Sequence, residues 1–224
     1  NLVAWYDFGD GNTVFNDAGS TKASNTDTIQ QVTNKAYDGL GASSTSLNSF
    51  IIQLSAGSRP TYYTAGYADF DGGDSLISSI LLGQVSVGKM GGVTLTQENF
   101  TISIVLDNDD PTPSSQKFYL GFGDAGRKAT TLGISSGNKL EWTGEADRTA
   151  NIASSGAYSG VKEYWTIVGG TANTSGSNVR TLAFYKNGVL DSTDTTDLST
   201  YNRIMTANDA DVGFQFGAWS GSSN

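Results

Sequence analysis

Acidic residues cluster in one short stretch that directly follows an apolar run. Asp107, Asn108, Asp109 and Asp110 come after F-T-I-S-I-V-L and before Pro111, so three carboxylates share one loop. Carboxylate and carbonyl oxygens are the ligands of hard cations, and the stretch is therefore a candidate structural Ca²⁺ site. It is not an EF-hand, because the required glycine and the final glutamate are missing. A solvated acidic loop is the alternative interpretation.

A second acidic group, Asp7, Asp10 and Asp17, lies near the start of the sequence. The same two interpretations apply to it, since a cation, solvent or a nearby base relieves the repulsion between carboxylates.

Paired carboxylates would be needed for glycoside hydrolysis, at separations of about 5 to 9.5 Å. Glu141 and Glu145 share a face of an extended segment, but their Cα atoms are about 13 Å apart there. Asp69 and Asp71 are about 6.6 Å apart. Asp71, however, opens the sequence D-G-G-D, in which Asp typically accepts hydrogen bonds from its own turn. We expect a turn at this place rather than catalysis.

Aromatic side chains in loops are the third kind of candidate, because sugars stack their apolar faces on such rings while polar side chains bind the hydroxyls. Tyr62 and Tyr63 follow Pro60, Tyr158 lies in a Gly/Ser-rich segment, and Trp219 lies near the end of the sequence. We expect these four aromatic residues to be exposed and to form the ligand-binding surface.

Composition excludes several other chemistries. The 224 residues include no Cys and no His, which removes thiolate chemistry, Ser-His-Asp triads and imidazole-ligated metals. The net charge is −9 with only 13 Lys and Arg, which argues against nucleic acid as a partner. No apolar run approaches the roughly 20 residues of a membrane-spanning helix, so we expect no membrane insertion. Aromatic residues reach 11%, which favours a folded domain over disorder.

The elements that would position these residues read as strands. Segments 100–106, 117–122, 139–144 and 211–216 alternate with a period of two. Asn187-Gly188 lies between two apolar runs and predicts a two-residue hairpin. Trp5, Trp142 and Trp165 fall within strand patterns, so we expect them in the core. The interior-facing residues predicted from the first and last segments are Phe100, Ile102, Ile104, Leu106, Phe214 and Phe216.

Helical signals are weak. The runs 75–82 and 198–205 are each long enough for two helical turns, but short apolar runs do not distinguish helix from strand. The many short strands separated by Gly, Asn and Asp predict an all-β fold, a two-sheet antiparallel β-sandwich or jelly roll with at most short helical turns. We expect a single domain over residues 1–224.

Several fragments, in order, resemble the concanavalin A-like lectin/glucanase superfamily, specifically its laminin-G-like jelly-roll branch. They are L-V-A-W-Y-D-F-G-D-G at the start, N-K-A-Y-D-G-L-G at 34–41, R-P-T-Y at 59–62, A-D-F-D-G-G-D-S-L at 68–76, E-N-F-T-I-S-I-V-L at 98–106, E-Y-W-T-I-V at 163–168 and F-Y-K-N-G-V at 184–189. The resemblance spans nearly the whole chain and implies the sandwich fold predicted above.

Two departures from the family matter. Thr166 and Ile167 stand where the family often has His, so nothing that depends on those residues carries over. In the family, a closing strand follows the one that resembles 212–216, whereas 217–224 is short and polar. We therefore expect a missing last strand, an open sheet edge beside 212–216, and a parent polypeptide that continues past Asn224.

Function does not follow from this fold, which carries lectins, hydrolases and structural spacers alike. The candidate residues favour a non-enzymatic carbohydrate- or receptor-binding attachment module on an extracellular or virion-surface protein, with a glycan or cell-surface receptor as its partner. One alternative is a purely structural virion decoration or tail-appendage domain that contacts other subunits. A glycan hydrolase is the second alternative.

Overall fold

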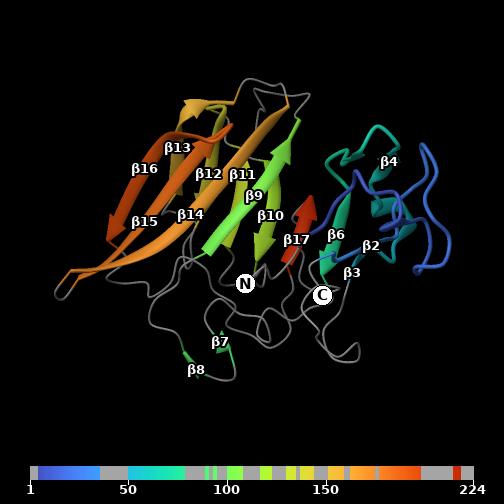
Figure 1. Cartoon of the computed structure of the whole chain (residues 1–224), viewed down its shortest axis with the longest axis horizontal. Helices are drawn as coiled ribbons and strands as arrows, with labels where there is room; N and C mark the ends of the chain where they lie inside the picture. Colours follow the sequence, from blue (N-terminus) through green and yellow to red (C-terminus); the bar gives the residue numbers. More distant parts are fainter. Residues whose placement is uncertain are drawn as a thin grey trace.

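A computed structural model of the chain shows an all-β fold (Figure 1). It describes residues 5–35, 50–78, 89–90, 93–94, 100–107, 117–122, 130–134, 137–143, 151–158, 162–174, 177–197 and 214–217. Helix is limited, within these residues, to one 3₁₀ turn, η1 (Ala56–Ser58). None of them forms a helix with the length and hydrophobicity that crossing a membrane demands.

The strands are short in the first part of the chain and longer after residue 100. They are β1 (Val14–Phe15), β2 (Gln31–Thr33), β3 (Phe50–Ile52), β4 (Thr61–Tyr63), β5 (Tyr67–Asp69), β6 (Ser75–Ser78), β7 (Lys89–Met90), β8 (Val93–Thr94), β9 (Phe100–Leu106), β10 (Lys117–Phe122), β11 (Thr130–Ile134), β12 (Lys139–Thr143), β13 (Asn151–Ala157), β14 (Glu163–Thr174), β15 (Ser177–Lys186), β16 (Val189–Asp197) and β17 (Phe214–Gly217).

These strands form two main antiparallel sheets. The larger has nine strands in the order β1-β2-β3-β6-β17-β10-β11-β12-β13, and the smaller has four in the order β16-β15-β14-β9. Figure 1 shows the four-stranded sheet lying over the β10–β13 part of the larger sheet, with β2, β3 and β6 on the other side of β17. The two remaining hairpins are β4-β5 and β7-β8. The predicted two-sheet antiparallel sandwich is confirmed.

The core lies between the two sheets. Trp142 and Leu132 on the larger sheet and Trp165, Ile167 and Phe184 on the smaller one are fully buried and belong to a single apolar cluster. Burial of each large side chain stabilises the fold by about 1.5 to 3 kcal/mol relative to exposure. The predicted core positions of Trp142 and Trp165 are confirmed.

The alternation predicted for strand β9 is also confirmed. Leu106 is buried, Ile102 and Ile104 pack against the core, and Val105 between them points outward and is exposed. Phe216 on β17 likewise packs against the core. The side chains of Phe100 and Phe214 lie outside the described part of the structure.

The hairpin between β15 and β16 has the predicted two-residue turn. Asn187 and Gly188 both have positive φ, 51° and 80°, as a type I′ turn requires. The Asn187 side chain also accepts a hydrogen bond from the Tyr164 amide (3.0 Å), while its own amide donates to the Tyr164 carbonyl (2.7 Å). Asn therefore both permits the turn and fixes it to β14.

A buried ion pair joins the same sheet to β13. Glu163 is only 2% exposed, and its carboxylate lies 2.6 Å from the Lys186 ammonium and accepts a hydrogen bond from the Trp165 indole (3.0 Å). Lys186 also donates to the Ala157 carbonyl (3.2 Å). The charge of Glu163 is thus compensated inside the fold, as burial of a carboxylate requires.

One expectation about the sheets is wrong, and one ambiguous run is resolved. Ser75–Ser78, which the sequence left open between helix and strand, forms β6, which pairs with β3 and β17 and buries Leu76. The 198–205 run lies outside the described residues. The open edge expected beside 212–216 is absent, because β17 pairs with β10 on one side and with β6 on the other. The prediction of a further strand beyond Asn224, and that of a single domain, stay predictions.

Candidate functional site

The β4-β5 hairpin carries the most exposed ring pair among the described residues. Tyr63 and Tyr67 are opposite each other across the two strands, and residues 64–66 connect them. Gly66 closes this turn with φ +96°, a conformation that favours glycine, and its amide donates to the Tyr63 carbonyl (2.9 Å). A three-residue loop that ends in such a glycine is a common hairpin connection.

The rings of the two tyrosines stack on each other. Their centroids are 4.7 Å apart with an interplanar angle of 12°, and Tyr67 is 49% exposed while Tyr63 is half-buried. Each ring restricts the other, so the pair offers an ordered aromatic surface to solvent. Ordered rings bind a ligand with a smaller loss of side-chain entropy than mobile ones.

A carboxylate lies on the same face of the hairpin. Asp69 follows Tyr67 by two residues along β5, and both are exposed whereas Ala68 between them is not. Within the part of the chain that the structure describes, the Asp69 carboxylate makes no hydrogen bond or ion pair. Tyr63, Tyr67 and Asp69 together are called the tyrosine face below. It combines two rings with a free hydrogen-bond acceptor.

Hydrogen bonds with residues 25–27 fix the hairpin that carries the tyrosine face. On the outer edge of β4, the Thr26 amide donates to the Tyr62 carbonyl and the Tyr62 amide donates to the Asp27 carbonyl, both at 2.8 Å. The Asn25 side chain accepts hydrogen bonds from the amide (3.0 Å) and the hydroxyl (3.2 Å) of Thr64 in the turn. The hairpin is therefore fixed at its edge and at its tip.

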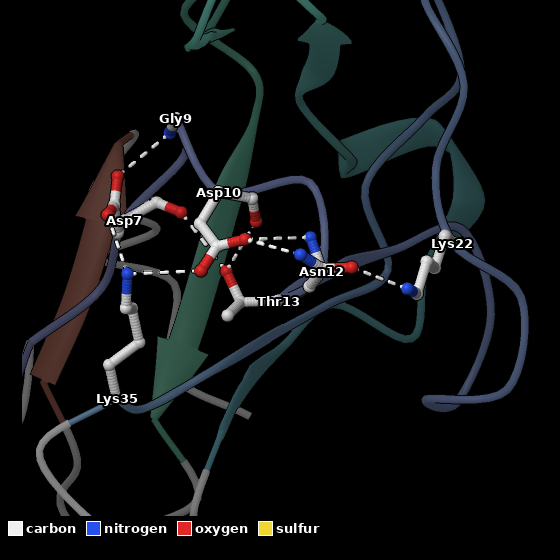
Figure 2. A network of polar contacts seen from close by, with 7 residues as sticks. All are labelled: Asp7, Gly9, Asp10, Asn12, Thr13, Lys22 and Lys35. Carbon is white, nitrogen blue, oxygen red and sulfur yellow. Dashed lines mark hydrogen bonds and ion pairs between the residues drawn. The ribbon is translucent and has the colours of Figure 1, made fainter.

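The N-terminal loop lies directly beside the hairpin turn. A Cβ built on Gly66 would be 3.4 Å from the Gly9 Cα, so the two backbones are in contact. Lys35, which follows β2, reaches this loop. Its ammonium lies between two carboxylates, 2.9 Å from that of Asp7 and 3.1 Å from that of Asp10 (Figure 2). We call these three residues the lysine clasp.

Charge in the lysine clasp is balanced by direct contacts. The Lys35 ammonium, followed by the Asn12 amide, lowers the pKa of Asp10, and the hydrogen bonds to Asp7 and then Asp10 raise the pKa of Lys35. The ammonium also lies 4.4 Å from the centroid of the Trp5 ring. The clasp thereby positions an aromatic ring that is 47% exposed.

Asp17 does not join the clasp. Its carboxylate accepts the amides of Gly19, Ser20 and Thr21 at 3.1, 2.8 and 2.9 Å. Hydrogen bonds from Thr21 and then from Ser20 lower its pKa from 3.8 to about 2. The Asp7, Asp10 and Asp17 group is thus divided between a lysine and a loop, and no set of three or more potential ligands for a metal ion occurs within the described ranges.

The second turn of interest, D-G-G-D, forms as expected. The Asp71 carboxylate accepts the Gly73 amide (2.9 Å), and the Asp71 amide donates to the Asp74 carboxylate (3.2 Å). Asp74 is buried, and this desolvation raises its pKa, with further contributions from the charges of Asp71 and Asp69. Asp71 therefore serves the turn rather than a catalytic pair with Asp69. Glu145, the partner considered for Glu141, lies outside the described residues.

The structure separates the four aromatic residues expected to be exposed. Tyr63 is partly exposed at the surface. Tyr62 is only 3% and Tyr158 only 1% exposed, so the prediction that they are exposed is wrong. Tyr62 points to the opposite side of β4 from Tyr63, because successive side chains of a strand alternate. Tyr158 is bonded through its backbone to Asn138, which accepts its amide and donates to its carbonyl, and its ring is in the core. Trp219 lies outside the described residues.

The predicted calcium loop is described only in part. Asp107 directly follows β9 and is exposed, while Asn108, Asp109 and Asp110 lie outside the described residues. Calcium binding there stays a prediction.

Three exposed aromatic residues of the described ranges, Trp5, Tyr67 and Tyr164, are not among the four predicted ones. Tyr67 lies two residues before Asp69 and directly after Gly66, so a hairpin with a short Gly-containing loop would have placed it opposite Tyr63. Trp5 was expected in the core because it falls within a strand pattern, but residue 5 is not in a strand and its ring is half-exposed over Lys35. No local pattern links Trp5 to a lysine 30 positions away.

The chain resembles known proteins only weakly. No model of a protein family matches the chain, and no curated protein does. The carbohydrate-binding module CBM40 of a Ruminococcus gnavus IT-sialidase, bound to α2,3 sialyllactose, aligns with 13% identity and a TM-score of 0.38 over 53% of this chain and 62% of that chain. The same module bound to α2,6 sialyllactose aligns with 14% identity and a TM-score of 0.36 over 54% of this chain and 64% of that chain. Both alignments cover less than two thirds of the module, and no functional conclusion rests on them.

Proposed function

We propose that this β-sandwich is a non-enzymatic glycan-binding module whose ligand lies on the tyrosine face. The observation that carries the proposal is the stacked, partly exposed pair Tyr63 and Tyr67 beside the Asp69 carboxylate, which makes no hydrogen bond or ion pair among the described residues. A pyranose ring presents apolar C–H groups that pack on an aromatic ring, and its hydroxyls donate to a carboxylate. The tyrosine face supplies both kinds of contact on one ordered hairpin.

Binding is favoured over hydrolysis by the surroundings of Asp69. Glycoside hydrolysis needs a second carboxyl group that is free to act as acid, base or nucleophile. Asp71 accepts the Gly73 amide in its own turn, and Asp74 is buried beneath it. Asp69 is thus the one carboxylate of this segment that accepts no hydrogen bond within the described residues.

We also propose that the module is exposed on an extracellular or virion surface. An acidic chain without Cys, rich in Gly and exposed aromatics, suits an attachment protein on an extracellular or virion surface. A structural decoration domain would share these properties but would not need the tyrosine face. Calcium would act at Asp107–Asp110 as a structural ion, and a calorimetric titration of the metal-free protein with CaCl₂ tests this directly.

Glycan-array screening followed by titration calorimetry tests the proposed function. Tyr67→Ala removes the more exposed ring, and we expect about a tenfold loss of affinity for any glycan that binds, which corresponds to about 1.4 kcal/mol. Tyr164→Ala is the matched control, because Tyr164 is a similarly exposed tyrosine on the four-stranded sheet. It should bind as the wild type does.

Three results would contradict the proposal. Binding to no glycan would favour the structural alternative, and release of reducing sugar would favour the hydrolase. Equal losses in the two variants would place the glycan elsewhere.

A further inference from the structure

Acidic residues outnumber basic residues around the tyrosine face. Residues 5–35 and 50–78, which surround the hairpin, contain seven aspartates but only three basic residues, Lys22, Lys35 and Arg59. Asp69 is on the tyrosine face itself, and the charges of Asp71 and Asp69 both contribute to the raised pKa of the buried Asp74, after desolvation. Among the described residues, the charges around this surface are therefore mainly negative.

Each of the three basic residues already contacts oxygen atoms of the protein. Lys35 is held between Asp7 and Asp10, and Lys22 donates to the Asn12 side chain (2.6 Å). Arg59 donates to the carbonyls of Gln53 (3.0 Å) and Leu54 (3.2 Å). Recruiting any of them to a ligand would require these contacts to break.

The loop amides that suit an anion are also occupied. Consecutive backbone N–H groups in turns form concave binding sites for anions. Here the carboxylate of Asp17 fills one such site with three amides, and Asp7 and Asp71 accept the amides of Gly9 and Gly73. The chain's own carboxylates thus take the places that a sulfate or a sugar carboxylate would use.

From this arrangement we infer that the tyrosine face is selective for neutral glycans and rejects glycans that carry carboxylate, sulfate or phosphate groups. The inference rests on the proposed function and narrows its ligand class. Asp69 is the selective element: it accepts hydrogen bonds from neutral hydroxyls and repels an anion placed on the adjacent rings. A like charge set against the wrong ligand gives specificity that attractive contacts alone do not.

A paired array tests the inference. Neutral oligosaccharides are printed beside their sialylated and sulfated counterparts, and the full chain is applied in buffer containing EDTA at low and at high salt. We expect neutral glycans to bind at least about tenfold more tightly than their charged counterparts at low salt. The difference should shrink at high salt, because screening weakens repulsion between exposed charges.

Charge removal gives the second readout. Asp69→Asn retains the size and one acceptor oxygen but loses the charge, so the neutral-to-charged affinity ratio should fall several-fold. Asp191→Asn removes the same charge from β16 in the four-stranded sheet and should leave the ratio unchanged.

The outcomes distinguish this inference from the proposed function. Charged glycans that bind as tightly as neutral ones, or a ratio that Asp69→Asn does not alter, would overturn neutral selectivity while leaving glycan binding intact. If no glycan of either kind binds, the proposed function fails and the inference falls with it.

Discussion

Two regions of this molecule reach a fixed structure by different physical means. The four-stranded sheet has long strands, up to 12 residues in β14, which pairs with β15 and β9 in continuous register, and it covers a core that includes Trp165, Ile167 and Phe184. The first 78 residues have described strands of two to four residues. Their loops are fixed by side chains that bind the backbone, such as Asp17, Asn25 and Asp71.

The difference shows two ways in which aromatic residues are held. In the four-stranded sheet, Trp165 and Phe184 are buried between the sheets, and Tyr164 is exposed on the regular strand β14. In the N-terminal region, polar contacts fix the backbone, and Trp5 and Tyr67 are held at the surface. The stacked pair Tyr63 and Tyr67 belongs to this loop-rich region.

The largest effect should come from a cavity in the four-stranded sheet. Phe184→Ala removes a fully buried ring and should lower the free energy of unfolding by about 3 to 5 kcal/mol. Urea denaturation followed by tryptophan fluorescence measures this. Leu190→Ala, an exposed residue on β16, should change stability by less than about 0.5 kcal/mol. A cost below about 1 kcal/mol for Phe184→Ala would mean that this sheet does not depend on its core.

Ion pairs in the two regions should respond differently. Glu163→Gln leaves Lys186 without its buried counter-charge and should cost about 1 to 3 kcal/mol, less than for a wholly buried pair because Lys186 is partly exposed. Lys35→Gln in the solvated lysine clasp should lower the free energy of unfolding by less. Only this loss should become smaller as the salt concentration rises, because salt screens exposed ion pairs. Denaturation of both variants at low and high salt checks this. Equal costs or equal salt responses would remove the contrast.

Backbone strain sharpens the comparison further. Asn187 suits its positive φ, whereas Thr26, with φ +69° beside the β4-β5 hairpin, is a β-branched residue in the same left-handed region. Thr26→Asn should raise the free energy of unfolding by about 0.5 to 1 kcal/mol. Thermal and urea unfolding measure the change, with Thr28→Asn as the control at a residue without positive φ. Destabilisation by Thr26→Asn would show that its hydroxyl, which donates to the Asn25 carbonyl, matters more than the strain.

The smallest effect should be a pH dependence confined to the N-terminal region. The folded-state pKa of Asp17 is lowered from 3.8 to about 2, so its contribution to stability is complete above pH 3.8 and is lost as pH falls toward 2. Asp17→Asn should remove this part of the acid-induced decrease in the melting temperature. Thermal unfolding of both proteins from neutral pH to about pH 2 provides the measurement. Identical acid profiles would contradict the assigned pKa.

The sequence predicts the regular half of the molecule better than the loop-rich half. Alternation along β9 and the Asn187-Gly188 turn are local patterns, and the structure follows both. Tyr62 and Tyr63 also carried usable information, because neighbours on a strand point to opposite faces and only one of them can face solvent. The error was to treat them as loop residues.

Other features have no local signal. The lysine clasp joins Asp7 to a lysine 28 positions later, and Tyr158 is buried through backbone contacts with Asn138. The β6 segment was ambiguous because a run of S-L-I-S fits a helix or a strand, and only pairing with β3 and β17 decides it. Contacts between distant segments thus determined what short patterns left open.

The central position of β17 has a consequence for how the protein is made. Phe214–Gly217 inserts between β6 and β10, which precede it by about 140 and 95 residues, so the nine-stranded sheet becomes continuous only after this segment leaves the ribosome. Until then the nascent chain has two sheet halves with unpaired edges facing each other, each able to pair with a neighbouring polypeptide. Translation of this segment is therefore the step that joins the two halves of the sheet, and truncation before residue 214 should yield aggregated protein.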